Sequence, residues 1–498
     1  MTLRAGCLAL LSLSSAMVAT GHAQQYRLRL DSRFQSVSFR GVALDSVPAA
    51  ATVLVGGSRQ TADGFAVSCL TGDTFCFFFR PGAIQTARPS VTSVAGTLWG
   101  LGVPGLSVRG DARVAMDLGD AEVLPGTNPA VQLLEGYVEY ATDRWTGRLG
   151  RQVYTSRLGF TGFDGARFTA RMVNRQVEVD GYLGWGLARG SALPVTSAAL
   201  NPLDDFQPHQ RQLVAGLGAG WNHRFGDLRL EYQREVDPQS SYFVSDRAAA
   251  ATSIRLSSRL SLNAGAEYDL AMARWGTTDA TLRFFQRTWS ATAGFTRYRP
   301  HFELWTIWGA FSPVGYSAVN GSVSVSPVAG LSVRARGSRF WFEDTETDTP
   351  LVTVEDRGWR VNVGATYSPS ESFSFNLDHD TEFGPGASSA SIDGGVTYLP
   401  ARDLSLTLHA GRLRRPLEFR FNDATLRMFG LDADWRFSDR WRASASASRF
   451  MEKRDRPDAS AFDWNQTRLS VQLSVMLGSD AGHQSLPPAV RSTDRPAK

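Results

Sequence analysis

The chain has no apolar run long enough to cross a bilayer as a helix. Such a helix needs about 20 consecutive apolar residues, and the apolar run 8–18 is much shorter. The sequence also lacks a glycine-rich phosphate loop between a strand and a helix, a helical metal-binding motif and a Cys-x-x-Cys-His haem attachment site. We therefore expect no cofactor, no metal site and no membrane-spanning helix.

Lysine is almost absent, because Lys453 and Lys498 are the only two lysines among 52 basic residues. Acidic residues number 48, so the formal net charge is only +4. A nucleic-acid-binding protein would show a concentrated basic face. The near-balance of charge argues against one, and we expect no nucleic-acid partner.

Cysteine is scarce, with three in the whole chain. Cys7 precedes the apolar run 8–18, whereas a lipidated cysteine would follow such a run, so we expect no lipid anchor there. Cys69 and Cys76 enclose the short segment 70–75, and no histidine or third cysteine lies near them to complete a metal site. In an oxidising compartment such a pair forms a disulfide. We predict a Cys69–Cys76 disulfide.

The first residues have the pattern of a secretory signal peptide. Arg4 supplies an early positive charge, the apolar run 8–18 follows, and small residues at 21–23 precede the expected cleavage site. We predict that residues 1–23 form a signal peptide and that the exported chain starts at Gln24. An exported membrane protein without spanning helices crosses the membrane as a β-barrel, the other structure that satisfies every backbone hydrogen bond in lipid.

The stretch 467–477, TRLSVQLSVML, alternates between apolar and polar side chains. Successive side chains of a strand point to opposite faces, so this stretch would have one apolar and one polar face. The apolar face consists of Leu469, Val471, Leu473, Val475 and Leu477, and the polar face of Arg468, Ser470, Gln472 and Ser474.

The same alternation recurs along the chain from Tyr26, and no helical segment is available to cover the apolar side. Lipid outside and water inside would cover the two faces, and pairing of 467–477 with the first strand would leave no open edge. We therefore predict an all-β fold, a transmembrane antiparallel up-and-down β-barrel of about 18–22 strands over residues 24–478. Residues 479–498 would form a polar periplasmic tail.

Charged side chains alternate with apolar ones on these strands and cannot point at lipid. An arginine at the middle of the bilayer would cost about 2–4 kcal/mol, so rows of charged residues are predicted to line a wet lumen. Carboxylate pairs within these rows are interpreted as ion-paired wall residues and not as acid–base catalysts. The lumen-lining residues expected are Arg109, Asp111, Arg113, Asp117, Glu135, Glu139, Arg148, Arg167, Arg171, Glu178, Asp180, Arg229, Glu231, Arg334 and Arg336.

Short turn sequences separate the strands, among them ProGly at 104–105, GlyAsp at 226–227 and SerAspArg at 438–440. In outer-membrane barrels short turns are periplasmic and longer loops are extracellular. We expect the longest loop at 41–90, of which 65–80 could in part be a strand. Further loops are expected at 186–212, 235–249, 343–356, 380–390, 413–426 and 451–465.

The segment 297–316 is the densest aromatic run of the chain. Aromatic residues at strand ends form an interfacial belt at the level of the lipid head groups, and this is the favoured interpretation. The alternative is a loop folded inward as a constriction, because Pro300 and Pro313 would interrupt strand pairing.

A barrel can also be an enzyme. Outer-membrane proteases of the omptin kind use paired aspartates and an Asp–His pair at the outer rim. The nearest materials here are Asp378, His379 and Asp380, and separately Asp432 and Asp434. Their spacing is wrong for a shared rim, and His379 falls on the apolar register of its strand. We predict no catalytic site.

Two short segments resemble a signature of porins. Residues 148–152, RLGRQ, are followed by residues 163–168, FDGARF. Together they resemble the Gly-Arg-Gln … Phe-Asp-Gly pattern of alginate-export-type outer-membrane porins. In that family the resemblance implies a monomeric barrel whose arginine-lined lumen passes an anionic sugar polymer or small polar solutes. It is not taken to imply alginate as the solute.

The residues around these segments predict a transverse electric field. Arg148, Arg167 and Arg171 would share the polar face, because the residues that alternate with them are apolar. Glu178 and Asp180 on the next strand would then face them. A lumen with both signs of charge on facing walls is expected, rather than a purely anion-attracting one.

Two functions of different classes fit these observations. The first is a passive outer-membrane channel of the porin type, which passes small polar or charged solutes or ions through an Arg/Asp/Glu-lined lumen and needs no cofactor. The second is a sheath that holds a periplasmic protein partner, such as a multihaem cytochrome in an electron-export conduit, whose haems would belong to the partner. In both cases the bacterial outer membrane supplies the surrounding lipid.

Overall fold

The computed structural model describes most of the chain between the predicted signal peptide and the predicted tail. Residues 1–24 and 480–498 lie outside the described part, so the predictions for both terminal segments remain predictions. The described residues are 25–479, apart from 56, 71, 73, 120–130, 173, 175, 188–211, 237–242, 300–314, 344–356, 385–386, 419–421 and 455–462.

The described residues are almost entirely β-structure, with one short 3-10 helix, η1 (Ala49–Ala51). No helix in the described part is long and apolar enough to cross a membrane. The strands are β1 (Gln25–Pro48), β2 (Val53–Val55), β3 (Ser58–Gln60), β4 (Phe75–Ala87), β5 (Pro89–Trp99), β6 (Leu106–Asp117), β7 (Val131–Ala141), β8 (Trp145–Ser156), β9 (Gly159–Met172), β10 (Val177–Gly186), β11 (Leu213–His223), β12 (Gly226–Val236), β13 (Phe243–Arg255), β14 (Leu260–Asp269), β15 (Arg274–Phe285), β16 (Trp289–Tyr298), β17 (Tyr316–Val325), β18 (Leu331–Phe342), β19 (Arg357–Tyr367), β20 (Phe373–Gly384), β21 (Ala387–Ala401), β22 (Leu404–Glu418), β23 (Asn422–Ser438), β24 (Trp441–Arg454) and β25 (Trp464–Gly478).

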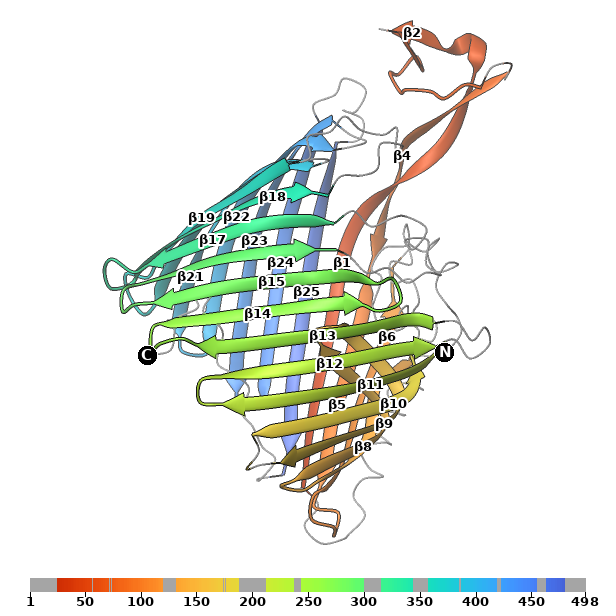
Figure 1. Ribbon diagram of the computed structural model, residues 1–498. Coiled ribbons are helices and arrows are strands. Elements are labelled where there is room, and N and C mark those ends of the chain that lie inside the picture. The colour runs from red at the N-terminus through yellow and green to blue at the C-terminus, as the bar shows by residue number, and fades with distance from the viewer. Residues whose placement is uncertain are drawn as a thin grey trace.

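These strands form a closed antiparallel barrel (Figure 1). β1 and β5–β25 make up 22 strands in up-and-down order, and each pairs with the next one in this order. The barrel closes where β25 pairs with β1, from Arg27 opposite Gly478 to Val37 opposite Arg468. The prediction of a barrel closed by 467–477 is confirmed, with a strand number at the upper end of the expected range.

The two faces of the wall differ in polarity as the alternation predicts. On β25, Val471 is 53% exposed, and on β11 Leu217 is 64% exposed, although both are large apolar residues of regular strands. Exposed apolar side chains occur around the whole barrel. Such a surface is stable only in lipid, and a closed barrel leaves no unpaired edge there. The protein is therefore a bacterial outer-membrane β-barrel.

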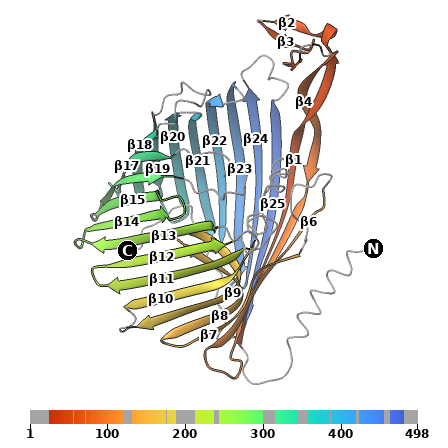
Figure 2. The ribbon, with the colours of Figure 1, turned by 45° about the vertical axis from the view of Figure 1, so that its right-hand side comes forward.

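The first strand runs beyond the barrel wall. Residues 25–34 of β1 pair with β5, whereas residues 37–48 pair with β4. The second pairing forms a two-stranded arm that extends past the rim and carries β2 and β3 at its tip (Figures 1 and 2). The disulfide between Cys69 and Cys76 joins the tip to the start of β4, as predicted.

Part of the loop prediction is wrong. The segment 41–90 is largely paired strand and not a loop, because its polar turn residues are confined to the tip of the arm. The segments 380–390 and 413–426 are also mostly strand, since the wall of the barrel continues above the expected membrane level. The turns at 104–105, 226–227 and 438–440 do fall between strands or at the ends of strands.

The two ends of the barrel are named here by their connections. The turn end carries the short connections that the sequence indicated, and the loop end carries those at 187–212, 237–242 and 455–463. The tight turn at 157–158, between β8 and β9, also lies at the loop end, because it follows the turn-end connection at 142–144 by one strand. The loop end is extracellular by the general rule for such barrels.

Replacing residues on the two faces of β25 tests this arrangement. Val471→Arg should block assembly, because it places a charge among lipid-exposed residues at a cost of about 2–4 kcal/mol. Ser470 lies opposite Gln35 and Ser446 on the polar face, so Ser470→Arg should be tolerated. The measurement is the fraction of protein that shows heat-modifiable mobility on gels after refolding into lipid vesicles. Equal tolerance of both variants would contradict the face assignment.

The state of the cysteines in the mature protein is a second test. The unfolded, unreduced protein should expose no free thiol to a thiol reagent, and reduction should release both Cys69 and Cys76. The barrel wall does not include either residue, so Cys69→Ser should leave refolding of the barrel intact. Reactive thiols in the unreduced protein would refute the disulfide.

Candidate functional site on the polar face

The polar face of the wall is built by strand register. Directly paired residues of neighbouring strands share a face, and Glu139, Arg148, Arg167 and Tyr182 follow one another in this way across β7, β8, β9 and β10. The face opposite to the exposed apolar belt therefore carries the charged residues that the sequence singled out. These charges are close enough to pair with one another.

Several residues predicted from the sequence form ion pairs with residues of the next strand or of the strand after it. Arg109 lies 3.1 Å from Glu135. Arg334 donates to Asp378 at 2.6 Å. These contacts agree with the interpretation of the carboxylates as ion-paired wall residues.

The remaining residues predicted on β6 and β18 have other surroundings. Arg113 donates a hydrogen bond to Gln132. Asp117 accepts hydrogen bonds from the backbone N–H groups of Arg88 and Gly119, both at 2.9 Å, at the loop end of β6. Asp111 lies opposite Ala95 and Glu135, and Arg336 lies opposite Ser322 and Asn362.

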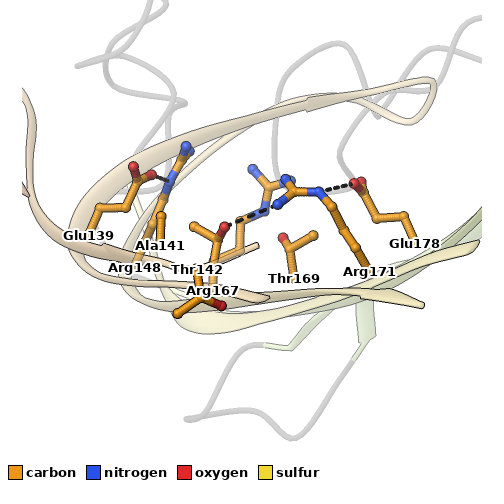
Figure 3. Close-up of a pocket in the computed structure, with 9 residues that line it drawn as sticks. Glu139, Ala141, Thr142, Arg148, Arg167, Thr169, Arg171 and Glu178 are labelled. Carbon is orange, nitrogen blue, oxygen red and sulfur yellow. Dashed lines mark hydrogen bonds and ion pairs between the residues drawn. The ribbon is translucent and has the colours of Figure 1, made fainter. Parts of the chain in front are cut away.

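A cavity of about 310 Å³ lies on this face near the turn end of β7–β10 (Figure 3). Arg148 donates to Glu139 at 2.5 Å. Arg171 donates to Glu178 at 3.2 Å. Because three arginines and two glutamates line the cavity, it carries a surplus of positive charge.

Arg167 supplies that surplus. Its guanidinium carbon lies 4.5 Å from the ring centroid of Tyr154, a cation–π contact. Among the described residues no carboxylate pairs with it, and its Nε atom is buried without a hydrogen-bond partner. The sequence predicted that Arg148, Arg167 and Arg171 would all meet Glu178 and Asp180. Of the three, only Arg171 does so, through Glu178.

Asp180 is bound instead by Arg229, two strands away in the sheet. The Asp180 side chain is completely buried, and Arg229 donates hydrogen bonds to it and, at 2.7 Å, to the Tyr154 hydroxyl. The Nε of Arg229 also donates to Glu231 at 3.2 Å. The charged members of this network were predicted from the sequence, but Tyr154 was not, because an uncharged tyrosine gave no signal.

The turn between β8 and β9 contacts strands that are not its neighbours. The backbone N–H of Arg157 donates to Glu231 of β12 at 2.9 Å. The guanidinium group of Arg157 donates to Asp279 and, at 3.4 Å, to the carbonyl of Thr277, both on β15, and lies 3.7 Å from Glu267 of β14. The tip of this hairpin is therefore held against three strands from a distant part of the sheet.

A small apolar cluster lies beneath these contacts. Tyr154, Phe163, Tyr182 and Val214 are all buried. The ring centroids of Tyr154 and Phe163 lie 4.9 Å and 5.1 Å from that of Tyr182. These four side chains on the polar face pack against one another and are shielded from water. We call this cluster the dry corner.

Glycines make room for this corner. A side chain at Gly216 would overlap the ring of Tyr182, and one at Gly184 would overlap Phe163. On β11, glycines at 216, 218 and 220 alternate with Leu217, Ala219 and Trp221 of the exposed face. This period-two glycine pattern was a signal in the sequence for close packing on the polar face.

The two segments that resemble alginate-export-type porins lie side by side. Arg151 is opposite Asp164, and Gln152 is opposite Phe163. Arg151 donates to Asp164 at 2.7 Å and 2.9 Å, but this pair shares the face of the exposed Leu149. The signature therefore contributes Arg148 and Arg167 to the polar face, while Arg151 lies on the other side of the wall.

The groups considered for catalysis are dispersed. Asp378 is paired with Arg334. His379 is hydrogen-bonded to Thr381 at 2.9 Å and faces the apolar side, opposite Ile392. In the part of the chain that the structure describes, no group of three histidine, cysteine or acidic residues could hold a metal ion.

The two other aspartates have partners of their own. Asp432 lies 3.0 Å from His409, and Asp434 is bound by Arg442 at 2.7 Å.

Most of the aromatic run, residues 300–314, falls outside the described residues, so the choice between belt and inward loop stays open. Its flanks are described. The rings of Tyr298 and Tyr316 lie 5.4 Å apart at the ends of β16 and β17. Glu343, just after β18, accepts from Arg297 at 2.7 Å and from Arg299. Burial alone would raise the pKa of Glu343, but the two arginines outweigh it and hold the pKa below its usual value.

No family model matches the chain, and no curated protein matches it in sequence.

Solved structures do resemble it. The siderophore receptor PirA from Pseudomonas aeruginosa shares 11% identity over 90% of this chain and 80% of that chain, with a TM-score of 0.40. A mutant of the ferric enterobactin receptor PfeA from the same organism shares 10% identity over 90% and 80%, with a TM-score of 0.47. OccAB1 from Acinetobacter baumannii shares 9% identity over 91% and 96%, with a TM-score of 0.38. At these values the likeness concerns the fold alone.

The buried pair of Asp180 and Arg229 predicts a clear difference in stability between two variants. Asp180→Asn should lower the free energy of unfolding by about 1–3 kcal/mol, because it leaves Arg229 without its fully buried counter-charge. Glu382→Gln, which breaks the more exposed pair with Arg360, should cost under about 1 kcal/mol. Urea unfolding in lipid vesicles, followed by tryptophan fluorescence, measures both. Equal losses would contradict a structural role for the buried pair.

Proposed function

We propose that this barrel is a passive outer-membrane channel whose polar face lines a water-filled lumen. The charged residues named from the sequence, from Arg109 on β6 to Arg336 on β18, share the face opposite to the exposed apolar belt. Lipid cannot solvate them, whereas water and paired charges can. The single observation that carries the proposal is this ladder of ion pairs on one face of a closed barrel.

The contact of Arg157 with β12, β14 and β15 supports an inward direction for this face. These strands are separated from the β8–β9 hairpin by intervening strands of the sheet. In a curved wall, side chains from distant strands approach one another on the concave side. The hairpin tip and the dry corner beneath it would then narrow one side of the lumen near its extracellular mouth.

The charges of the proposed lumen define the solutes it would pass. The cavity around Arg148, Arg167 and Arg171 has a surplus positive charge close to the glutamates of the same wall. Small polar or anionic solutes would be drawn to the arginines without being held by a deep, closed site. The local resemblance to alginate-export-type porins supports the same class of solute, and no alginate specificity is proposed.

The sheath for a periplasmic partner remains the second candidate from the sequence. A partner that fills the barrel would need an interior free of bulky structure. If the polar face points inward, the buried cluster of Tyr154, Phe163 and Tyr182 and the hairpin tip occupy part of that interior. The channel is therefore favoured over the sheath.

Single-channel recording of the refolded mature chain in a planar bilayer tests the proposal. Discrete conductance steps with measurable anion and cation permeability are expected. A folded, inserted but silent barrel would refute an open channel. Haem absorbance that copurifies with the protein from its native membrane would then support the sheath.

A matched pair of variants tests whether the polar face sets ion selectivity. Arg167→Gln removes a cation that no carboxylate balances, so the ratio of anion to cation permeability should fall. Arg151→Gln removes a cation from the opposite face of the same hairpin, where Asp164 balances it, and the ratio should stay unchanged. The reversal potential in a salt gradient reports both ratios. A larger effect of Arg151→Gln would contradict the proposal, because it would mean that the lumen lies on the opposite face of the wall.

A further inference from the structure

A group of positive charges lies on the apolar face of the wall, at the loop end of three neighbouring strands. Arg412 and Arg414 belong to β22, Arg427 to β23, and Arg449 and Lys453 to β24. All five are exposed. Nearer the turn end, the same face of these strands carries the apolar residues that meet lipid. The five charged residues therefore cannot belong to the proposed lumen.

Strand register brings these charges together. Arg412 lies directly opposite Arg427, and Arg414 and Lys453 both lie opposite Thr425 on the strand between them. Arg449 is the diagonal neighbour of Arg427, since it lies opposite Phe429. Like charges that face each other across a strand pair destabilise a sheet. An anion bound between these residues would offset the repulsion.

The height of these charges on the wall follows from the strands. On β22 the apolar face carries Leu404, Leu406 and Leu408 before Arg412. Eight residues of strand span roughly 26 Å, which at the usual tilt corresponds to a rise of roughly 20 Å, close to the height of the apolar band of such barrels. Trp441 and Arg449 of β24 have the same spacing. The charges thus lie where the acyl region ends and the head groups of the outer leaflet begin.

A cavity of about 670 Å³ opens between these side chains. Four cations and two carboxylates contribute to its lining, so positive charge prevails. Its lining residues are Arg412, Arg414, Thr425, Arg427, Met451, Glu452, Lys453, Asp463 and Asn465.

Two other arginines of the apolar face do have carboxylate partners. Arg151 is paired with Asp164 on the same face of β8 and β9. Arg297 is paired with Glu343 at 2.7 Å near the ends of β16 and β18. Arg412, Arg427 and Lys453, by contrast, have no carboxylate partner among the residues that the structure describes. These three cations differ in this respect from Arg151 and Arg297.

We infer that this cavity binds the phosphate groups of the outer-leaflet glycolipid, lipid A. Arginine presents a planar fork of N–H donors that matches a phosphate, and paired arginines hold one phosphate from two sides. The apolar strand surface directly below the cavity, at Leu408 and Phe429, would take the acyl chains of the same molecule. Inorganic phosphate shares the charge but not these chains.

Lipid binding to the purified, delipidated mature protein in detergent tests this inference. The probes are bisphosphorylated lipid A, its dephosphorylated form and inorganic phosphate, and native mass spectrometry reports each bound species. The bisphosphorylated lipid should bind about tenfold or more tightly than the dephosphorylated form. The double variant Arg412→Gln with Arg427→Gln should abolish that preference, because it removes the facing pair of charges.

Arg468→Gln is the matched control, because it removes one arginine from the opposite face of β25 at a similar level, where Arg468 lies opposite Ser448. It should keep the full preference, and heat-modifiable gel mobility should confirm that all variants are folded. Equal affinity of the wild type for both lipids would overturn the inference, as would a double variant that keeps the preference. Inorganic phosphate that binds as tightly as the lipid would show a free-anion site instead.

Discussion

The satisfaction of backbone hydrogen bonds in lipid is the constraint on which the structure depends. A strand in a bilayer cannot leave an N–H or C=O group unpaired, so the sheet has to close on itself. Closure occurs along the seam between β1 and β25. Once the wall is closed, alternation along each strand decides what each side chain meets. Closure of the sheet therefore underlies both the apolar belt on one face of the wall and the ion pairs on the other.

The contacts on the polar face also fix the shape of part of the wall. Some of its ion pairs join neighbouring strands, whereas the contacts of Arg157, Arg229 and Arg334 join strands that are not adjacent in the sheet. Glycines at 216 and 184 let the rings of Tyr182 and Phe163 approach the backbone closely in the dry corner. A wide barrel without such contacts would have only its strand pairing to fix its cross-section. The corner gives one part of the wall a defined shape.

The sequence predicted whatever depends on alternation alone. Val471 and Ser470 were assigned to the correct faces of β25, and the seam with the first strand was anticipated, because period two is a local property. The arm was missed because turn-rich segments such as 56–74 mask the pairing of the strands around them. The partners of Asp180 and Arg157 were missed because they come from strands far away in the chain. No local pattern specifies which distant strands meet. The alternating glycines of β11 indicate close packing on the polar face, but they do not identify the side chains that pack against them.

The seam also imposes an order in time. β1 begins at Gln25 and its partner β25 ends at Gly478, so the contact that closes the wall joins the first and the last strand of the barrel. Every other wall strand can pair with a neighbour that was synthesised next to it. The closing contact has the largest sequence separation in the barrel, and such contacts form slowly because of their loop-closure entropy. The barrel therefore cannot close before β25 has been made, and until then β1 has to be kept from pairing with other chains.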